Sequence, residues 1–274
     1  MVQNAYNMSL VTLINNLSFV VSHISYATVQ PGCWYNGPAI PYNKLYYIIR
    51  GRGRVLQADQ EVVLLPGRVY LFRLNIECKN YAEQELEHVW VHFKFKCGTN
   101  PDFFELFESS RPWYSCSQAM LKYIKKSSQT PDPIKGLHFN TILQKTIQRF
   151  IGDPCADYEH KLRINGKYAK LFAYIEECLL TGLHLPELAA VMNVTPTHLS
   201  FMFRKDTGQT LKHYITRQLL SRASHELLYT DRPIKEIARD LGFDYEIYFS
   251  RLFKKFMHCT PTEFRRRTIT SRSR

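Results

Sequence analysis

The sequence predicts an α+β protein of two domains, with an N-terminal β-sandwich or barrel, a helical linker, and a C-terminal all-α domain that carries two helix-turn-helix motifs. Short strand-like runs fill the N-terminal third, the apolar period changes to the helical one from about residue 102, and one helical pattern occurs twice near the C-terminus. A length of 274 residues suits two domains of about 100–200 residues each. We expect the boundaries at 1–97, 98–165 and 166–270.

Residues 19–95 form short apolar or alternating runs that are rich in Val, Ile, Tyr and Phe, as is typical of β-strands. Turn residues separate these runs, among them Gly51, Gly53 and the pair Pro66-Gly67. The strand candidates are residues 20–29, 45–49, 54–58, 62–65, 69–74 and 88–95. Many short strands with no helical stretch between them predict a sandwich or a small barrel.

The middle of the chain has apolar residues at helical spacing, starting with Phe103, Phe104 and Phe107. Polar stretches with Pro and Gly at 127–133 and 152–157 divide it into a small set of amphipathic helices. Two roles stay open for these helices. They supply the contacts of a homodimer, or they cover one face of the β domain.

The strongest signal is an internal repeat in the last third of the chain. Leu188-Ala189 matches Ile237-Ala238, 49 positions later, and Leu199 matches Phe249, 50 positions later. In each unit a small residue allows two helices to approach, and a residue that tolerates a left-handed backbone follows in the turn. A side-chain cap then begins the next helix. These turn and cap residues are Asn193 and Thr195-Pro196 in the first unit (185–206), and Gly242 and Asp244 in the second (234–256).

A connecting helix is expected between the two units, because apolar residues step by four along one face. These residues are Leu211, Ile215, Leu219, Ala223 and Leu227. Such a helix would hold the units rigidly and allow two recognition helices to enter successive major grooves about 34 Å apart.

These residues resemble the signature of AraC/XylS-type transcriptional regulators. The matching anchors are Ile237-Ala238, Gly242-Phe243, Tyr248-Phe249-Ser250-Arg251, Phe253-Lys254-Lys255, Thr260-Pro261 and Phe264-Arg265, and the resemblance extends back to about Arg163. Two positions depart from the family pattern: His258 stands where glycine is usual, and Leu211 where proline is expected. The resemblance implies a sequence-specific transcription regulator whose partner is a double-stranded DNA operator. If it is an activator, RNA polymerase is a further partner.

The formal net charge of +12 suits a polyanionic partner. By resemblance, the outward residues of the recognition helices read base edges, for which Arg suits guanine, Glu suits cytosine, and Phe or Ile suits a thymine methyl. A solvated helix face is the alternative for any one of them. They are Thr197, His198, Ser200, Phe201 and Arg204 in the first unit, and Tyr245, Glu246, Ile247, Tyr248 and Arg251 in the second. Arg204, Lys205, Lys254 and Lys255 are expected on phosphates.

The N-terminal pattern is similar to the cupin-like sensor domain of sugar-responsive members of the same family, through residues 48–53, 65–67, 70–72 and 88–93. Alternation along the last of these segments puts His88, Trp90 and His92 on one face, and Val89, Val91 and Phe93 on the core face. By resemblance the first face binds a small effector, such as a sugar or a related metabolite. The alternative is a half-exposed strand face with a satisfied histidine. The cupin metal set is missing, so we expect neither a metal site nor a cofactor.

The sequence therefore predicts an effector-modulated transcription regulator and not an enzyme. One alternative is a cupin-fold metalloenzyme fused to a DNA-binding module. Another is a DNA-repair fusion with a reactive cysteine, although Cys178 and Cys259 lie in helical, core-adjacent segments. Seven scattered cysteines, no signal segment and no long apolar run predict a cytoplasmic protein without a membrane partner.

Overall fold

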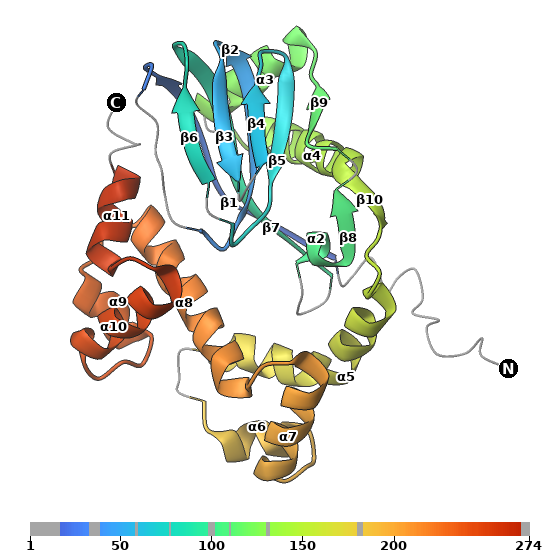
Figure 1. The fold of residues 1–274 in the computed structure, drawn as a ribbon, viewed down its shortest axis with the longest axis vertical. Helices are drawn as coiled ribbons and strands as arrows, with labels where there is room; N and C mark the ends of the chain where they lie inside the picture. The colour runs from blue at the N-terminus through green and yellow to red at the C-terminus, as the bar shows by residue number, and fades with distance from the viewer. Residues whose placement is uncertain are drawn as a thin grey trace, which may run out of the picture.

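The computed structural model has the predicted two-domain α+β architecture (Figure 1). A β domain with two helices on one face lies beside a domain made only of helices. The structure describes residues 17–32, 39–57, 60–76, 78–97, 102–109, 111–129, 132–179 and 183–269.

The β domain contains two antiparallel sheets. The five-stranded sheet has the order β1 (Leu17–Val29), β7 (Leu86–Cys97), β2 (Asn43–Arg50), β5 (Arg68–Phe72) and β9 (Trp113–Ser115). The three-stranded sheet has the order β4 (Gln60–Leu64), β3 (Gly53–Gln57) and β6 (Cys78–Ala82). All six strand candidates overlap an observed strand, although Ala58, the last residue of one candidate, lies outside the described residues. Strand β6 was not predicted, because its short sequence CKNYA has only Cys and Ala as small apolar inward residues.

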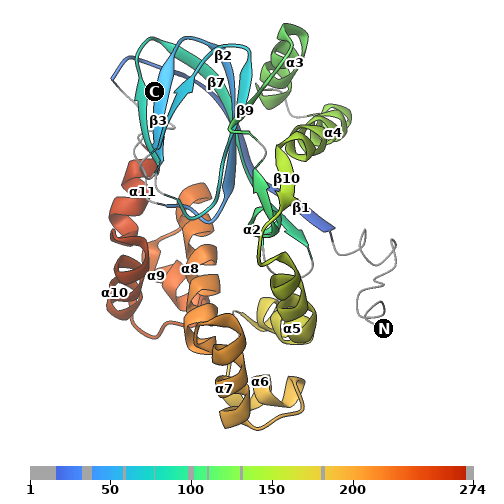
Figure 2. The same ribbon diagram turned by 45° about the vertical axis from the view of Figure 1, so that its right-hand side comes forward.

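Each face of the five-stranded sheet has its own core. Between the sheets, residues such as Tyr46, Ile48 and Tyr70 pack against Val55 and Leu64 of the smaller sheet. On the opposite face lie α3 (Gln118–Gln129) and α4 (Pro133–Phe150), as Figure 2 shows. Helix residues there meet Val89, Val91 and Phe93 of β7 in a single cluster. The predicted core face of this strand is therefore confirmed, and α3 and α4 cover the sheet.

The segment around residue 107 differs from the helical prediction. Helix α2 (Phe103–Leu106) ends where the extended backbone of Phe107 begins β8 (Phe107–Ser109), which pairs with β10 (Ile151–Pro154). The sequence pattern predicts a helix at Phe107, because this residue follows Phe103 at a spacing of four. Its ring does stack on that of Phe103, with centroids 4.6 Å apart, but from a strand. The predicted break at 127–133 also starts too early, because α3 continues to Gln129.

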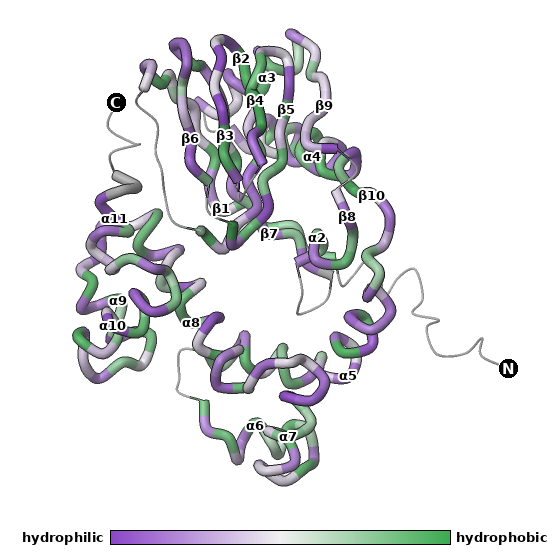
Figure 3. The backbone as a smooth tube through the Cα atoms, viewed as in Figure 1, coloured by the Kyte–Doolittle hydropathy of each residue, from purple (hydrophilic) through white to green (hydrophobic). Residues whose placement is uncertain are grey.

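The helical domain has two hydrophobic cores that share one helix. Its first core joins α5, α6, α7 and the start of α8. Its second joins the rest of α8 with α9, α10 and α11, and it also takes in Ile40 and Tyr42 from the β domain. Apolar and polar residues alternate along these helices in Figure 3. None of the helices in the described ranges has the length and apolar character needed to cross a bilayer. The bounds are α5 (Tyr158–Cys178), α6 (Leu185–Val191), α7 (Pro196–Thr207), α8 (Leu211–Tyr229), α9 (Ile234–Asp240), α10 (Glu246–Met257) and α11 (Pro261–Ile269).

Gly51 occupies a turn that no side chain fits. Its φ is +86°, and a Cβ there would lie 2.0 Å from the carbonyl oxygen of Glu85. We expect Gly51→Ala to lower the free energy of unfolding by about 2–5 kcal/mol, through left-handed strain and overpacking. Urea denaturation measures this. Gly136→Ala is the matched control, because a Cβ in this exposed turn of α4 meets open space and should be neutral or stabilising. Equal effects of the two substitutions would contradict the close approach.

Candidate nucleic-acid interface and effector face

The first helix-turn-helix unit consists of α6 and α7. Leu188 and Ala189 of α6 are buried against Leu199 and Phe203 of α7, the pair predicted to face inward. The turn passes through Asn193, whose φ of +51° confirms the left-handed backbone expected there. Thr195 then caps α7, since its hydroxyl accepts a hydrogen bond of 3.2 Å from the amide of His198. The cap satisfies one of the amides that a helix start leaves without a partner.

The second unit, α9 and α10, repeats the packing but not the cap. Ile237 and Ala238 pack against Phe249 and Phe253 in the second core, and Gly242 has a φ of +80°. The prediction that Asp244 caps the helix is wrong. Helix α10 begins one residue later, after Tyr245, and no side chain caps it. The shift follows from the extra residue in this turn, which moves the helix start away from the carboxylate.

The residues predicted to read DNA all lie on α7 and α10 or at their starts, and they form the solvent-facing side of each helix. Phe201 is 65% exposed, Tyr245 74% and Ile247 69%, which is unusual for large apolar side chains. The others are exposed too, except Ser200, which is half-buried: Thr197, His198, Arg204, Lys205, Glu246, Tyr248, Arg251, Lys254 and Lys255. The two units thus present two separate faces of mixed aromatic, polar and basic character.

Helix α8 sets the separation of these faces. Its residues Leu211 and Tyr214 belong to the first core, while Leu220, Ala223 and Leu227 belong to the second. Nineteen helical residues span about 28 Å. Because both cores are built on the same continuous helix, neither unit can move independently without exposing apolar surface.

The predicted effector face is divided between two environments. His88 and Trp90 lie between the sheets of the β domain, where the ring of His88 meets those of Tyr46 and Trp90 at 5.7 and 5.3 Å. His88 is 3% exposed, and burial lowers its pKa to about 4. His92 lies further along the strand and accepts or donates a 2.6 Å hydrogen bond with the hydroxyl of Tyr229. In the described ranges, no group of three His, Cys, Asp or Glu residues is placed to hold a metal ion.

Sequence reasoning missed the contact between the two domains, which we call the docking contact. It includes three hydrogen bonds: His92 with Tyr229, the Tyr42 hydroxyl with Nδ1 of His225 at 2.8 Å, and Lys94 Nζ donating to Ser221 Oγ at 3.0 Å. Burial is the main reason that the pKa of His92 lies well below its usual range. A signal existed in the sequence, because polar and aromatic residues step by four along α8 opposite its apolar stripe: His213, Arg217, Ser221, His225 and Tyr229.

Comparison with known proteins agrees with this architecture. A family model described as a helix-turn-helix domain matches residues 188–267. The regulatory protein SoxS of Escherichia coli K12 is 38% identical over 97 residues, which are 35% of this chain and 91% of that protein. The arabinose operon regulatory protein of the same strain is 27% identical over 233 residues, covering 79% of this chain and 78% of that protein.

The fold of nearly the whole chain also has a solved counterpart. The crystal structure of unsaturated fatty acid bound wild-type ToxT from Vibrio cholerae covers 90% of this chain and 95% of that chain. The TM-score is 0.53 and the sequence identity 14%. The likeness concerns the two-domain fold alone.

His258 is a second departure from ideal local structure in the second unit. It ends α10 with a φ of +58°, whereas Gly208 ends α7 with a φ of +72°. Because a side chain strains this conformation, we expect His258→Gly to raise the free energy of unfolding by about 1 kcal/mol. The reciprocal change Gly208→Ala should lower it by a similar amount. Guanidinium denaturation of both variants checks this. A destabilised His258→Gly variant would mean that the imidazole contacts outweigh the backbone strain.

The lowered pKa of His88 makes the folded state less stable as the pH falls. Below about pH 6.5 the unfolded chain takes up a proton at this residue, while the folded chain stays neutral down to about pH 4. We therefore expect the parent to lose about 2–3 kcal/mol more than His88→Gln between these pH values, as measured by urea denaturation. His138→Gln, a change at an exposed position of α4, is the control and should follow the parent. Parallel profiles for the parent and His88→Gln would refute the assignment.

Proposed function

This chain belongs to the AraC/XylS family of DNA-binding transcription regulators, and we propose that it binds an operator with both helix-turn-helix units under the control of a small effector. The main support is that the two units have exposed recognition faces and that their hydrophobic cores share helix α8. A shared helix keeps the faces at a constant separation, which is what two successive major grooves of one DNA duplex require.

Base reading is assigned to the first two turns of each recognition helix, and phosphate contact to its basic C-terminal end. Thr197, His198, Ser200 and Phe201 read the first half-site, and Tyr245 to Tyr248 with Arg251 read the second. Arg204, Lys205, Lys254 and Lys255 lie in the last turns of α7 and α10, where they neutralise phosphates. The exposed aromatic side chains meet thymine methyls, which lowers the cost of their exposure in the free protein.

The effector is assigned to the β domain, and a carbohydrate is the proposed class. His88 and Trp90 would bond and stack on a sugar ring between the sheets. A relative named for the arabinose operon supports this class. The docking contact gives a route to the DNA-binding units, because His92 and Lys94 continue the same strand and bond α8. An effector acts here only if it binds one arrangement of the two domains more tightly than the other.

We extend the proposal to a homodimer that contacts RNA polymerase when it acts as an activator. The exposed side chains of Ile134 and Leu137 on α4, at 69% and 67%, support a surface for a second copy. Activity as an enzyme is not part of the proposal.

Selection from a random DNA library with the full chain tests the proposed function. We expect enrichment of a sequence with two half-sites about one helical turn apart, and affinity that falls steeply between low and moderate salt. Repeating the selection with neutral sugars tests the effector. Failure to enrich any sequence, or binding that does not respond to salt, would contradict operator recognition.

A substitution of Arg251 distinguishes a base-specific contact from a phosphate contact. We expect Arg251→Ala to weaken binding to the enriched sequence by about 10–100-fold and binding to random DNA far less, because a bidentate contact to guanine is specific. Lys254→Ala, one turn further along α10, should weaken both to a similar extent, as a phosphate contact does. Fluorescence anisotropy at constant salt gives the four affinities. Equal losses for Arg251→Ala on both DNAs would reassign it to a phosphate.

A further inference from the structure

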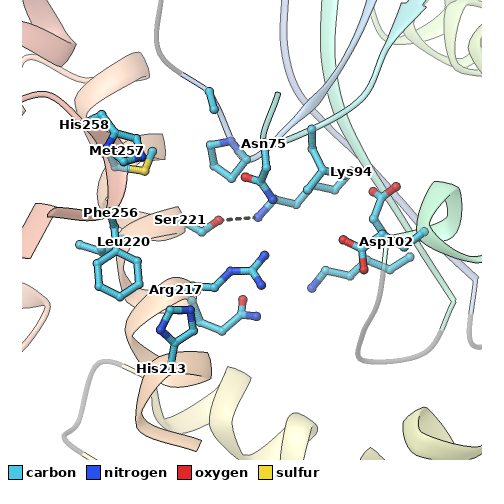
Figure 4. Close-up of a pocket in the computed structure, with 16 residues that line it drawn as sticks. Asn75, Lys94, Asp102, His213, Arg217, Leu220, Ser221, Phe256, Met257 and His258 are labelled. Atoms are coloured by element: carbon cyan, nitrogen blue, oxygen red, sulfur yellow. Dashed lines mark hydrogen bonds between the residues drawn. The ribbon is translucent and has the colours of Figure 1, made fainter. Parts of the chain in front are cut away.

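A cavity of ≈ 640 Å³ lies between the two domains (Figure 4). Strand β7, α2 and the segments at 39–41 and 74–75 form one side, and α8 with the end of α10 forms the other. Its size falls within the usual range for small-molecule sites, about 300–1,000 Å³. We infer that this cavity is a ligand site for a small carboxylate that also carries hydrogen-bond donors. It is distinct from the sugar site proposed between the sheets.

The basic side of the cavity has hydrogen-bond donors that the described part of the chain does not use. Arg217 extends from α8 into the cavity, and within the described ranges its guanidinium makes no hydrogen bond or ion pair. Lys94 approaches from the opposite wall and donates to Ser221 Oγ, which leaves it further protons to donate. Lys96 already pairs with Glu176 at 2.9 Å. Arg217 and Lys94 therefore converge from two domains on a space that suits an anion.

The burial of Lys94 strengthens this assignment. Its ammonium group is removed from water at the domain boundary, and burial lowers its pKa to about 8. A carboxylate bound beside it would favour the charged form and replace the lost hydration. The same carboxylate would meet the planar fork of Arg217 with two parallel hydrogen bonds.

The acidic side of the cavity defines the rest of the ligand. Asp102 is occupied, because it accepts hydrogen bonds from Asn43 Nδ2 and from the backbone amides of Phe95 and Phe104. Glu105 differs: its carboxyl accepts no hydrogen bond from the described residues, and burial raises its pKa against the pull of Arg217. A hydroxyl or ammonium group of the ligand would satisfy Glu105.

This combination separates the proposed ligand from two other classes. A neutral sugar would offer the guanidinium of Arg217 no anionic hydrogen-bond acceptor, and a long-chain fatty acid would leave Glu105 without a donor. Leu220, Phe256 and Met257 supply the apolar part of the wall, enough to cover a short carbon skeleton. A sugar acid or an acidic amino acid meets all of these requirements.

A ligand here would touch the β domain, the helix that both cores share, and the end of the second helix-turn-helix unit at once. Arg217 stands on the helix that both cores share, and Phe256 and Met257 end the second recognition helix. Binding would favour the docked arrangement of the domains over any other by its difference in affinity. This consequence for regulation rests on the proposed function, whereas binding itself does not.

Calorimetric titration of the full chain tests the site with four probes: glucuronate, glutamate, glucose and oleate. We expect heat of binding with glucuronate or glutamate and none with glucose or oleate at this cavity. Arg217→Ala should weaken that binding at least about tenfold. Lys212→Ala removes an exposed cation from the same helix outside the cavity, and should leave the affinity unchanged.

Glu105→Gln provides a second variant that keeps the shape of the side chain. We expect it to weaken glucuronate or glutamate, because the amide accepts donors less strongly than a carboxylate. Binding of oleate alone, binding that survives Arg217→Ala, or no binding of either carboxylate overturns the inference. Fluorescence anisotropy with operator DNA, in the absence of any of the four probes, tests DNA binding separately. A failure of carboxylate binding can therefore be told apart from a failure of DNA binding.

Discussion

Helix α8 buries one stripe of side chains in two separate hydrophobic cores, and the remaining architecture depends on this double burial. Leu211 and Tyr214 close the core of the first unit, and Ala223 and Leu227 close that of the second. Neither core is complete without the helix, so its continuity couples the stability of both units. The opposite stripe of the same helix is left for contacts with the β domain, where Ser221, His225 and Tyr229 are hydrogen-bonded.

Strand β7 plays the corresponding part in the β domain, through the alternation of its side chains. One face supplies Val89, Val91 and Phe93 to the core under α3 and α4. The other face begins between the sheets at His88 and Trp90 and ends at the docking contact with His92 and Lys94. Strand β7 therefore joins the space between the sheets to α8 through one continuous stretch of backbone.

Sequence reasoning succeeded where structure follows from neighbours in the chain. The repeat, the turn residues Asn193 and Gly242, and the cap at Thr195 are all local features, and each is present. It failed where a contact joins distant segments. His92 and Tyr229 are 137 residues apart, and no local pattern pairs them. Asp244 was misassigned because the extra residue in this turn moves the start of α10 away from its carboxylate.

The two helix-turn-helix units differ in the caps at the ends of their recognition helices. In the first, Thr195 caps the start of α7 and Gly208 relaxes its end; in the second, α10 has no side-chain cap and ends on His258 in a left-handed conformation. We therefore expect the second unit to open before the first in local fluctuations, with amides in α10 exchanging with solvent before those in α7. The end of α10 also borders the β domain. Contacts with the β domain can therefore stabilise the second unit directly.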